Sequence, residues 1–254
     1  MTNKFYAEGE QRAARVNQLF TAIAARYDLI NDLQSFGLHR LWKRRLLRLA
    51  HPQPGLRALD LCCGTGDVAL ALARRGAETT GLDFTENMLA VANHRVDAEN
   101  SHRPPGAPAL PVKFVRGDAL QIPYPDASFD IVTISYGLRN LADLDLGLRE
   151  MHRVTRPGGR ILVLDFGKPD NALWRGIYFS YLRHIVPLLG RIFSGDRETH
   201  GYILESLNHY AAQKGVAAKM TALSLTQVRI INLMGGIMSI NYAEKQSQPP
   251  PGRQ

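Results

Sequence analysis

Short apolar runs that end in Gly or Asp alternate with helix-like stretches over residues 57–165. This alternation is typical of a doubly wound α/β fold, in which each strand of a mostly parallel sheet is followed by a helix. The predicted strands are Arg57–Leu61, a run that ends at Gly81–Asp83, Val112–Arg116, Phe129–Ser135 and Arg160–Asp165. Helices are predicted at 67–75, 85–98 and 143–155, and Arg156-Pro-Gly-Gly is the expected turn into the fifth strand.

The end of the chain has a different pattern. Val228–Leu233 and Ile237–Ala243 are predicted strands, and Met234-Gly-Gly between them predicts a tight turn and an antiparallel hairpin. A mostly parallel sheet that closes with an antiparallel strand is not expected of a nicotinamide-binding Rossmann domain.

The length of 254 residues, with 45% hydrophobic residues, indicates one globular domain with appendages. Residues 1–50 are the expected N-terminal helical lid, 51–245 the main domain with a helical insertion at about 170–210, and 246–254 a disordered, proline-rich tail. No apolar run reaches the roughly 18 to 20 residues that span a bilayer, and the N-terminus does not resemble a signal peptide. We therefore expect a cytoplasmic protein.

The net charge of +8 is unevenly distributed, because residues 1–50 contain nine Lys and Arg residues against four Asp and Glu residues. Such an excess of positive charge is compatible with binding to nucleic acid, with binding to an anionic membrane surface, or with a solvated helix face that has no partner. The basic residues that would add weak attraction to anionic lipid are Arg40, Lys43, Arg44, Arg45 and Arg48.

A glycine-rich loop, Asp60-Leu-Cys-Cys-Gly-Thr-Gly-Asp67, lies between the first predicted strand and its helix. A backbone without Cβ atoms approaches a ligand closely there, and helix N–H groups point outward. Gly64 to Ala69 also match a dinucleotide-binding fingerprint, G-x-G-x-x-A. Asp83, at the end of the second strand, supplies a carboxylate that accepts from both hydroxyls of a ribose. Both NAD and S-adenosylmethionine meet that requirement.

A third acidic residue favours S-adenosylmethionine over NAD as the cofactor. Asp118 follows the third strand, where a carboxylate accepts from the exocyclic amine of adenine, and Ser135 ends the fourth strand beside the expected sulfonium. Polar contacts after four successive strands resemble the class I S-adenosylmethionine-dependent methyltransferases. The candidate cofactor-binding residues are Asp60, Gly64, Thr65, Gly66, Asp83, Phe84, Asp118, Ala119 and Ser135.

Further motifs indicate a particular family within this class of methyltransferases. They are Phe20, the segment Arg26–Asp32, the segment Ser35–Lys43, the segment Ile134–Asn140 and Arg156–Arg160. Together with the glycine loop they resemble the ubiquinone/menaquinone biosynthesis C-methyltransferase family over about residues 5–243. The resemblance places that family's cofactor contacts at Thr65, Asp83, Asp118, Ala119 and Ser135. Cys62 stands where many class I methyltransferases have the first glycine of the loop.

The resemblance implies C-methylation of a prenylated quinol. We expect demethylmenaquinol to be converted to menaquinol; the benzoquinol intermediate of ubiquinone synthesis, or both acceptors, is the alternative. An RNA methyltransferase and an NAD-dependent dehydrogenase are the other classes considered. Asp118 and the closing hairpin disfavour the dehydrogenase, and without an RNA-recognition motif no nucleic-acid partner is expected. The oligomeric state stays open, and contact with the inner face of the membrane is expected to be peripheral.

Methyl transfer is a direct displacement that requires no metal, so the protein must align the reactants and exclude water. We expect Arg139 to stabilise a quinol oxyanion and Asn140 to orient it, unless the pair only fixes its own loop. Tyr27 in the lid is a candidate for proton exchange with the substrate, and His39 is a candidate general base or part of a basic helix face. Cys62 and Cys63 are expected to be packing residues.

An apolar helical stripe is predicted after the fifth strand, with a kink at Pro187. It either packs on the core or forms a wall for the prenyl chain or an interfacial contact. Its members are Trp174, Ile177, Tyr178, Tyr181, Leu182, Ile185, Leu188, Leu189, Ile192 and Phe193.

Overall fold

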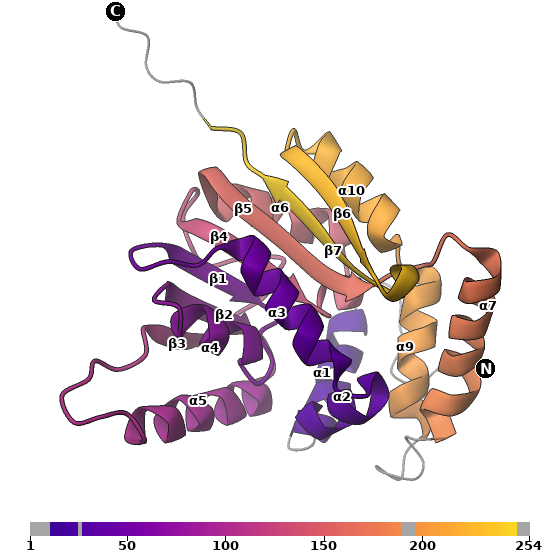
Figure 1. Cartoon of the computed structure of the whole chain (residues 1–254), viewed down its shortest axis with the longest axis horizontal. Helices are drawn as coiled ribbons and strands as arrows, with labels where there is room; N and C mark the ends of the chain where they lie inside the picture. The colour runs from indigo at the N-terminus through magenta and orange to yellow at the C-terminus, as the bar shows by residue number, and fades with distance from the viewer. Residues whose placement is uncertain (1–10, 25–26, 189–196, 248–254) are drawn as a thin grey trace, which may run out of the picture.

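The computed structural model describes residues 11–24, 27–188 and 197–247, and its centre is one seven-stranded sheet (Figure 1). The strand order is β3-β2-β1-β4-β5-β7-β6. The strands are β1 (Arg57–Leu61), β2 (Glu78–Asp83), β3 (Val112–Arg116), β4 (Phe129–Ser135), β5 (Thr155–Phe166), β6 (Thr226–Leu233) and β7 (Met238–Glu244). The first five strands are parallel, and β7 is antiparallel to both β5 and β6. The predicted α/β class and the closing hairpin are confirmed.

Helices connect the strands and extend beyond the sheet. They are α1 (Gln11–Ile23), α2 (Tyr27–Ser35), α3 (Leu38–Ala50), α4 (Asp67–Ala73), α5 (Glu86–Ser101), α6 (Leu144–Val154), α7 (Ala172–Ser180), α9 (Arg197–His209) and α10 (Ala212–Ala222). Short helical turns are η2 (Leu138–Asn140), η3 (Tyr181–Ile185) and η4 (Met234–Gly236).

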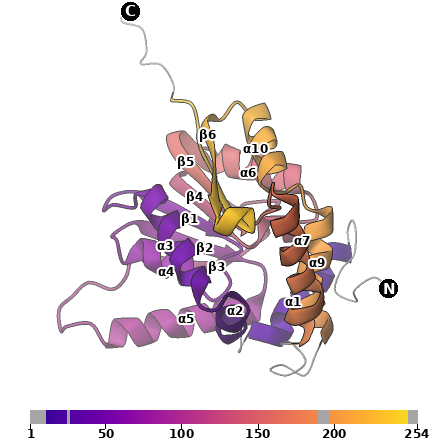
Figure 2. The same ribbon diagram turned by 45° about the vertical axis from the view of Figure 1, so that its right-hand side comes forward.

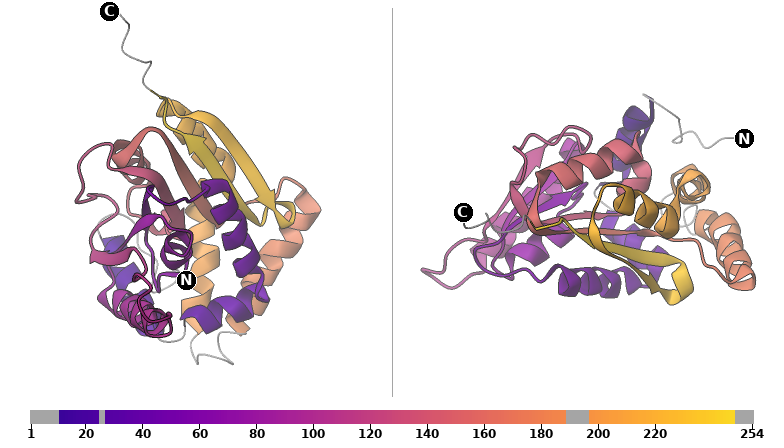
Figure 3. Two further views of the ribbon diagram at one scale, coloured as in Figure 1. Left: turned by 60° about the vertical axis from the view of Figure 1, so that its left-hand side comes forward. Right: turned by 90° about the horizontal axis from the view of Figure 1, so that it is seen from above.

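The strands bury both faces, because successive side chains point to opposite helical layers. Leu59 and Leu61 of β1 pack in one cluster with residues of α6 and α10, whereas Ala58 packs in a second cluster with residues of α3 and α4. The right-hand view of Figure 3 shows the sheet between these two layers. Helices α1, α2, α7 and α9 gather instead at the end of the sheet where β5 ends (Figures 1 and 2).

Two predicted boundaries differ most from those in the structure. Strand β5 already begins at Thr155, so the Arg156-Pro-Gly-Gly segment belongs to the start of the strand. It forms the irregularity in the pairing with β4, which becomes regular from Arg160. Helix α5 continues to Ser101, three residues past its predicted end, because the first proline that stops it is Pro104.

The structure also narrows the expected lid. Leu46, Leu47 and Ala50 of α3 are buried against the sheet, so α3 belongs to a helical layer. We call helices α1 and α2 alone the lid. Residues 1–10 of the predicted lid and 248–254 of the predicted tail lie outside the described residues.

The apolar stripe divides into two sides. Tyr178, Leu182 and Val186 are buried in the core, as core packing predicts, while Ile177 and Ile185 face outward. Instead of a simple proline kink, a π-helical turn at η3 precedes Pro187. Leu189, Ile192 and Phe193 lie outside the described residues.

Candidate active site

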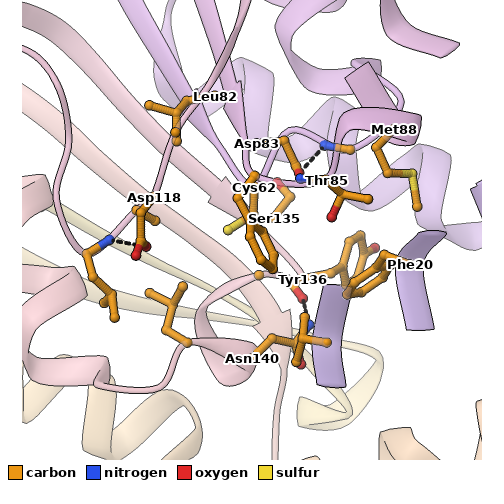
Figure 4. A pocket seen from close by; sticks show the side chains of 18 of the residues that line it. Phe20, Cys62, Leu82, Asp83, Thr85, Met88, Asp118, Ser135, Tyr136 and Asn140 are labelled. Atoms are coloured by element: carbon orange, nitrogen blue, oxygen red, sulfur yellow. Dashed lines mark hydrogen bonds between the residues drawn. The ribbon is translucent and has the colours of Figure 1, made fainter. Parts of the chain in front are cut away.

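The loops that follow β1 to β4 line a first cavity with about 800 Å³ of free space, including its open side (Figure 4). All four loops lie at one edge of the sheet, because the carboxyl ends of parallel strands meet there, and the strand order reverses between β1 and β4. Six of the predicted cofactor residues line this cavity: Gly64, Asp83, Phe84, Asp118, Ala119 and Ser135.

Asp83 connects two of these loops. Its Oδ2 accepts from the backbone N–H of Gly64 at 2.9 Å, and its Oδ1 accepts from the N–H of Thr85 at 2.8 Å. Each carboxylate oxygen has a further lone pair, so the group can still accept from the hydroxyls of a bound ribose. Burial raises the pKa of Asp83, and the backbone N–H groups oppose that shift by stabilising the charge.

Asp118 and Ser135 present polar groups on the other strand ends. Asp118 is exposed and its Oδ1 accepts from the N–H of Leu120 at 2.8 Å. The hydroxyl of Ser135 is buried and has no hydrogen-bond partner among the described residues. A buried hydroxyl without a partner is costly, so a polar ligand is favoured at this point.

Three of the predicted cofactor residues do not line the cavity. Asp60 lies beneath the loop, where its carboxyl accepts from the hydroxyl of Thr133 at 2.7 Å. Burial raises the pKa of Asp60 to about 7. Gly66 has a φ of +84° and caps the start of α4, and Thr65 is buried under α2. These residues therefore support the loop and do not form the cavity wall.

The turn itself contains Cys62 in a left-handed conformation, with a φ of +50°. Glycine adopts this conformation without strain, which explains why it is common at this position of the loop. A Cβ atom added to Gly137 would lie 2.5 Å from Cβ of Cys62, so the loop after β4 needs a glycine beside this cysteine. Burial raises the pKa of both Cys62 and Cys63, so both stay as thiols. Cys63 is packed in the core as predicted, whereas Cys62 also lines the first cavity.

Charged side chains from three helices hold the glycine loop against the lid. Thr65 donates its hydroxyl to Asp28 of α2 at 2.9 Å, and Nη1 of Arg95 donates to the carbonyl of Thr65 at 3.0 Å and to Asp28 at 3.2 Å. Asp67 accepts from Arg95 at 2.5 Å and from Lys43 at 2.7 Å. Although burial alone would raise it, the pKa of Asp67 is held well below its ordinary range by these two cations. We call these residues the lid–loop network.

A second cavity, with about 990 Å³ of free space, lies between the lid, α3, the end of β5 and the α7–η3 helix. Its wall is mostly aliphatic and aromatic. Phe20, Tyr27 and Tyr136 line both cavities, so the two spaces meet at these three side chains. The wall of the second cavity also includes Leu19, Ile23, Ile30, Trp42, Phe166, Leu182, Val186, Ile203, Ile237 and Met238.

The structure separates the predicted pair Arg139 and Asn140. Asn140 lines the first cavity and donates to the carbonyl of Tyr136 at 3.2 Å. Arg139 lines the second cavity, is almost fully buried, and pairs with Asp165 at 2.8 Å. Its Nη1 also donates to the carbonyl of Tyr136 at 2.6 Å, and its guanidinium lies 4.6 Å from the ring centre of Phe166.

Asp165 was missed from sequence. Asp165 lies near the end of β5, just as Asp83 lies at the end of β2. Its pairing with a buried arginine depends on a contact between distant segments, which leaves no local pattern in the sequence.

The ionisable groups of the second cavity differ in their ability to take a proton. Burial raises the pKa of Tyr27, Tyr136 and Tyr178, so these phenols stay protonated at neutral pH. The hydroxyls of Tyr136 and Tyr178 are buried without a partner among the described residues. His39 is buried, its Nε2 lies 2.8 Å from Asp32, and burial lowers its pKa, so it is neutral at pH 7.

Comparison with known proteins identifies the family. The profile of the ubiE/COQ5 methyltransferase family matches residues 8–245. The chain belongs to that family. It is 40% identical over 242 residues to the ubiquinone/menaquinone biosynthesis C-methyltransferase of Rubrivivax gelatinosus, covering 95% of this chain and 91% of the relative. It is 38% identical over 241 residues to the demethylmenaquinone methyltransferase of Desulfitobacterium hafniense, covering 93% and 92%.

A solved structure supports the fold. An S-adenosylmethionine-dependent methyltransferase from Aquifex aeolicus superposes with a TM-score of 0.55 at 15% identity, over 79% of this chain and 88% of that one. The ubiE/COQ5 chain is thus an enzyme that transfers methyl groups, with S-adenosylmethionine as its cofactor. The cofactor supplies an electrophilic methyl group on a sulfonium, and the polar strand ends of the first cavity fit a molecule of this kind.

We expect Asp83→Asn to weaken cofactor binding about 10- to 100-fold, because it removes the charge that strengthens the hydrogen bonds to ribose hydroxyls. Titration calorimetry with S-adenosylhomocysteine measures this change. Asp97→Asn, which alters an exposed carboxylate on α5, is the matched control and should bind as the wild type does. Equal affinity in both variants would contradict the assignment of Asp83.

The raised pKa of Asp60 predicts that the stability of the fold depends on pH. Its pKa is near 7 in the folded chain against an ordinary 3.8, so the folded state binds the proton more tightly. Its stabilising effect is full below about pH 4 and is lost as the pH rises through 7. Between about pH 4 and pH 8 the free energy of unfolding should fall less in Asp60→Asn than in the wild type. The difference should be on the order of a few kcal/mol. Urea unfolding of cofactor-free protein at several pH values tests this, and parallel curves would refute it.

Proposed function

We propose that this enzyme methylates a ring carbon of a prenylated quinol, converting demethylmenaquinol to menaquinol. The observation that carries the proposal is the junction at Phe20, Tyr27 and Tyr136, where the cavity that contains the polar strand ends meets a larger, mostly apolar one. An acceptor with a polar ring and a long apolar chain suits that second cavity. The Desulfitobacterium relative is named for demethylmenaquinone, and the Rubrivivax relative for both quinone classes. The benzoquinol intermediate of ubiquinone synthesis is therefore the second candidate acceptor.

In this proposal the strand-end residues bind the cofactor. Asp83 accepts from the ribose hydroxyls, Asp118 accepts from the adenine amine, and Ser135 uses its unpartnered hydroxyl near the sulfonium end. Gly64, Phe84 and Ala119 contribute backbone and apolar contacts to the same cavity. Thr65, Gly66 and Asp60 act indirectly, because they hold the loop.

The acceptor must be in its reduced form. A ring carbon becomes a good nucleophile when a neighbouring hydroxyl loses its proton, and a quinone has no such hydroxyl. A phenol has an ordinary pKa near 10, so a base is needed at neutral pH. Among the described ionisable side chains that line the second cavity, His39 alone is neutral and basic at pH 7. We assign the base to His39, held by Asp32 at Nε2, with Nδ1 left to accept the proton.

Protons balance in this scheme. The hydroxyl proton passes to Nδ1 of His39, a carbon–carbon bond forms as the carbon–sulfur bond breaks, and the ring hydrogen then leaves to water. His39 returns its proton to the oxygen as the ring regains aromaticity. One proton is released for each methyl group transferred.

Two further side chains, Arg139 and Tyr27, stabilise the ionised acceptor. Arg139, fixed by Asp165, faces the second cavity and stabilises negative charge on the ring oxygen. Tyr27 keeps its proton because of its raised pKa, so it acts as a hydrogen-bond donor at the junction and not as a base. Asn140 lines the first cavity only, so in this scheme it acts on the cofactor's side of the junction.

A long prenyl chain keeps the acceptor in a bilayer, so the enzyme must work as a peripheral protein at a membrane surface. Among the described residues, no helix is long and apolar enough to cross a membrane.

The direct test measures transfer of labelled methyl from S-adenosylmethionine to short-chain demethylmenaquinone, with and without dithionite. We expect label in the product only under reducing conditions, because only the quinol has an ionisable hydroxyl. The matching methoxy-benzoquinol and bulk tRNA are assayed in parallel. Label on the benzoquinol alone would make the ubiquinone intermediate the acceptor in place of demethylmenaquinol. Label on tRNA alone would overturn the proposal.

His39→Asn tests the assigned base. We expect kcat at pH 7 to fall at least tenfold, and the deficit to shrink as the pH approaches the quinol's own pKa, where the acceptor ionises without help. The affinity for S-adenosylhomocysteine should not change, because His39 does not line the first cavity. His94→Asn, an exposed histidine on α5, is the control. An unchanged pH profile in His39→Asn would rule out the assignment.

A further inference from the structure

The outer side of the α7–η3 helix is apolar although it has no cover among the described residues. Leu173 is 76% exposed, Ile177 52%, Ile185 43% and Leu188 48%, and Trp174 lies beside them. We call these five residues the α7 face. A shallow groove runs along it between Ala172 and Ile185. Soluble proteins seldom expose so many large apolar side chains together, and such patches mark interaction sites.

The α7 face is additional to the side of the helix that packs on the core. Tyr178, Leu182 and Val186 on the inner side are already buried. A surface helix of a soluble protein normally has polar residues on its outer side. Core packing therefore accounts for the inner side only, and the outer side needs another apolar partner.

The α7 face adjoins the wall of the second cavity. Tyr181 lines both that cavity and the shallow groove. Its hydroxyl donates to the carbonyl of Gln34 at 3.0 Å, which joins η3 to the end of α2. Two residues further along, Phe36 is 77% exposed in the turn before α3. Large apolar side chains are thus exposed on both sides of this contact between the lid and η3.

The charge near this face is positive. Residues 171–188 contain Arg175 and Arg183, both exposed, and no Asp or Glu. Arg44 and Arg45 are also exposed, but they lie on α3, a separate helix. Lys43, predicted to attract lipid, is instead largely buried and paired with Asp67, and Arg40 shares Asp32 with His39.

We propose that the α7 face and Phe36 dock on an anionic lipid bilayer, so that the second cavity draws its acceptor from the membrane. The choice of a bilayer as the partner rests on the proposed function. If the acceptor has a long apolar chain, docking on the bilayer lets it reach the second cavity without crossing water. Apolar side chains enter the interface while neighbouring arginines contact anionic headgroups. A second copy of the chain fits less well, because a symmetric contact would bring the same arginines together.

The test compares Ile177→Asp with Ile230→Asp, which places the same charge on an exposed isoleucine of the edge strand β6. Vesicles of phosphatidylcholine, with and without phosphatidylglycerol, are sedimented with each protein. We expect wild type and Ile230→Asp to bind the anionic vesicles, and Ile177→Asp to bind at least tenfold more weakly. Equal affinity for S-adenosylhomocysteine in all three proteins checks that they are folded.

Turnover adds a second readout. With a soluble short-chain quinol, Ile177→Asp should match wild type, whereas with a long-chain quinol embedded in vesicles it should lose at least tenfold. Wild-type protein that ignores anionic vesicles, or an Ile177→Asp variant that binds them normally, would overturn the proposal. A change in oligomeric state in Ile177→Asp, seen by light scattering with vesicle binding retained, would assign the face to a second copy instead. Vesicle binding as expected without turnover of any quinol would reject the proposed function and leave the docking surface standing.

Discussion

Carboxylates and cations from distant segments fix the turn that follows β1. Asp83 accepts from the N–H of Gly64, and the lid–loop network ties Thr65 and Asp67 to α2, α3 and α5. A glycine-rich turn has many conformations available when unfolded, so such contacts are needed to hold one of them. The shape of the first cavity and the position of α2 therefore depend on the same set of charges.

This coupling explains why Tyr27 lies at the junction of the two cavities. Tyr27 directly precedes Asp28, which the network fixes against Thr65 and Arg95. The side chain at the junction of the two cavities is thereby positioned by the glycine-rich loop itself. Methyl transfer needs this close alignment, because the protein accelerates a displacement mainly by bringing the reactants into line and excluding water.

The sequence was sufficient for the sheet and the closing hairpin. Six of the nine candidate cofactor-binding residues line the first cavity, because parallel strands place their carboxyl ends at one edge of the sheet. Asp60 and Thr65 do not line that cavity, because Asp60 accepts a hydrogen bond from Thr133 on the neighbouring strand and the hydroxyl of Thr65 donates to Asp28. The sequence also could not supply Asp165 as the partner of Arg139, or show which side of the α7–η3 stripe is buried. Those features depend on contacts between segments far apart in the chain.

The central claim is that the acceptor ring occupies the second cavity and meets the cofactor at Phe20, Tyr27 and Tyr136. A crystal structure with S-adenosylhomocysteine and a short-chain demethylmenaquinol tests it most directly. The account predicts the sulfur in the first cavity, the ring in the second beside His39 and Arg139, and the unmethylated ring carbon facing the sulfur between the three shared side chains. A ring bound outside the second cavity, or turned with that carbon away from the sulfur, would contradict it.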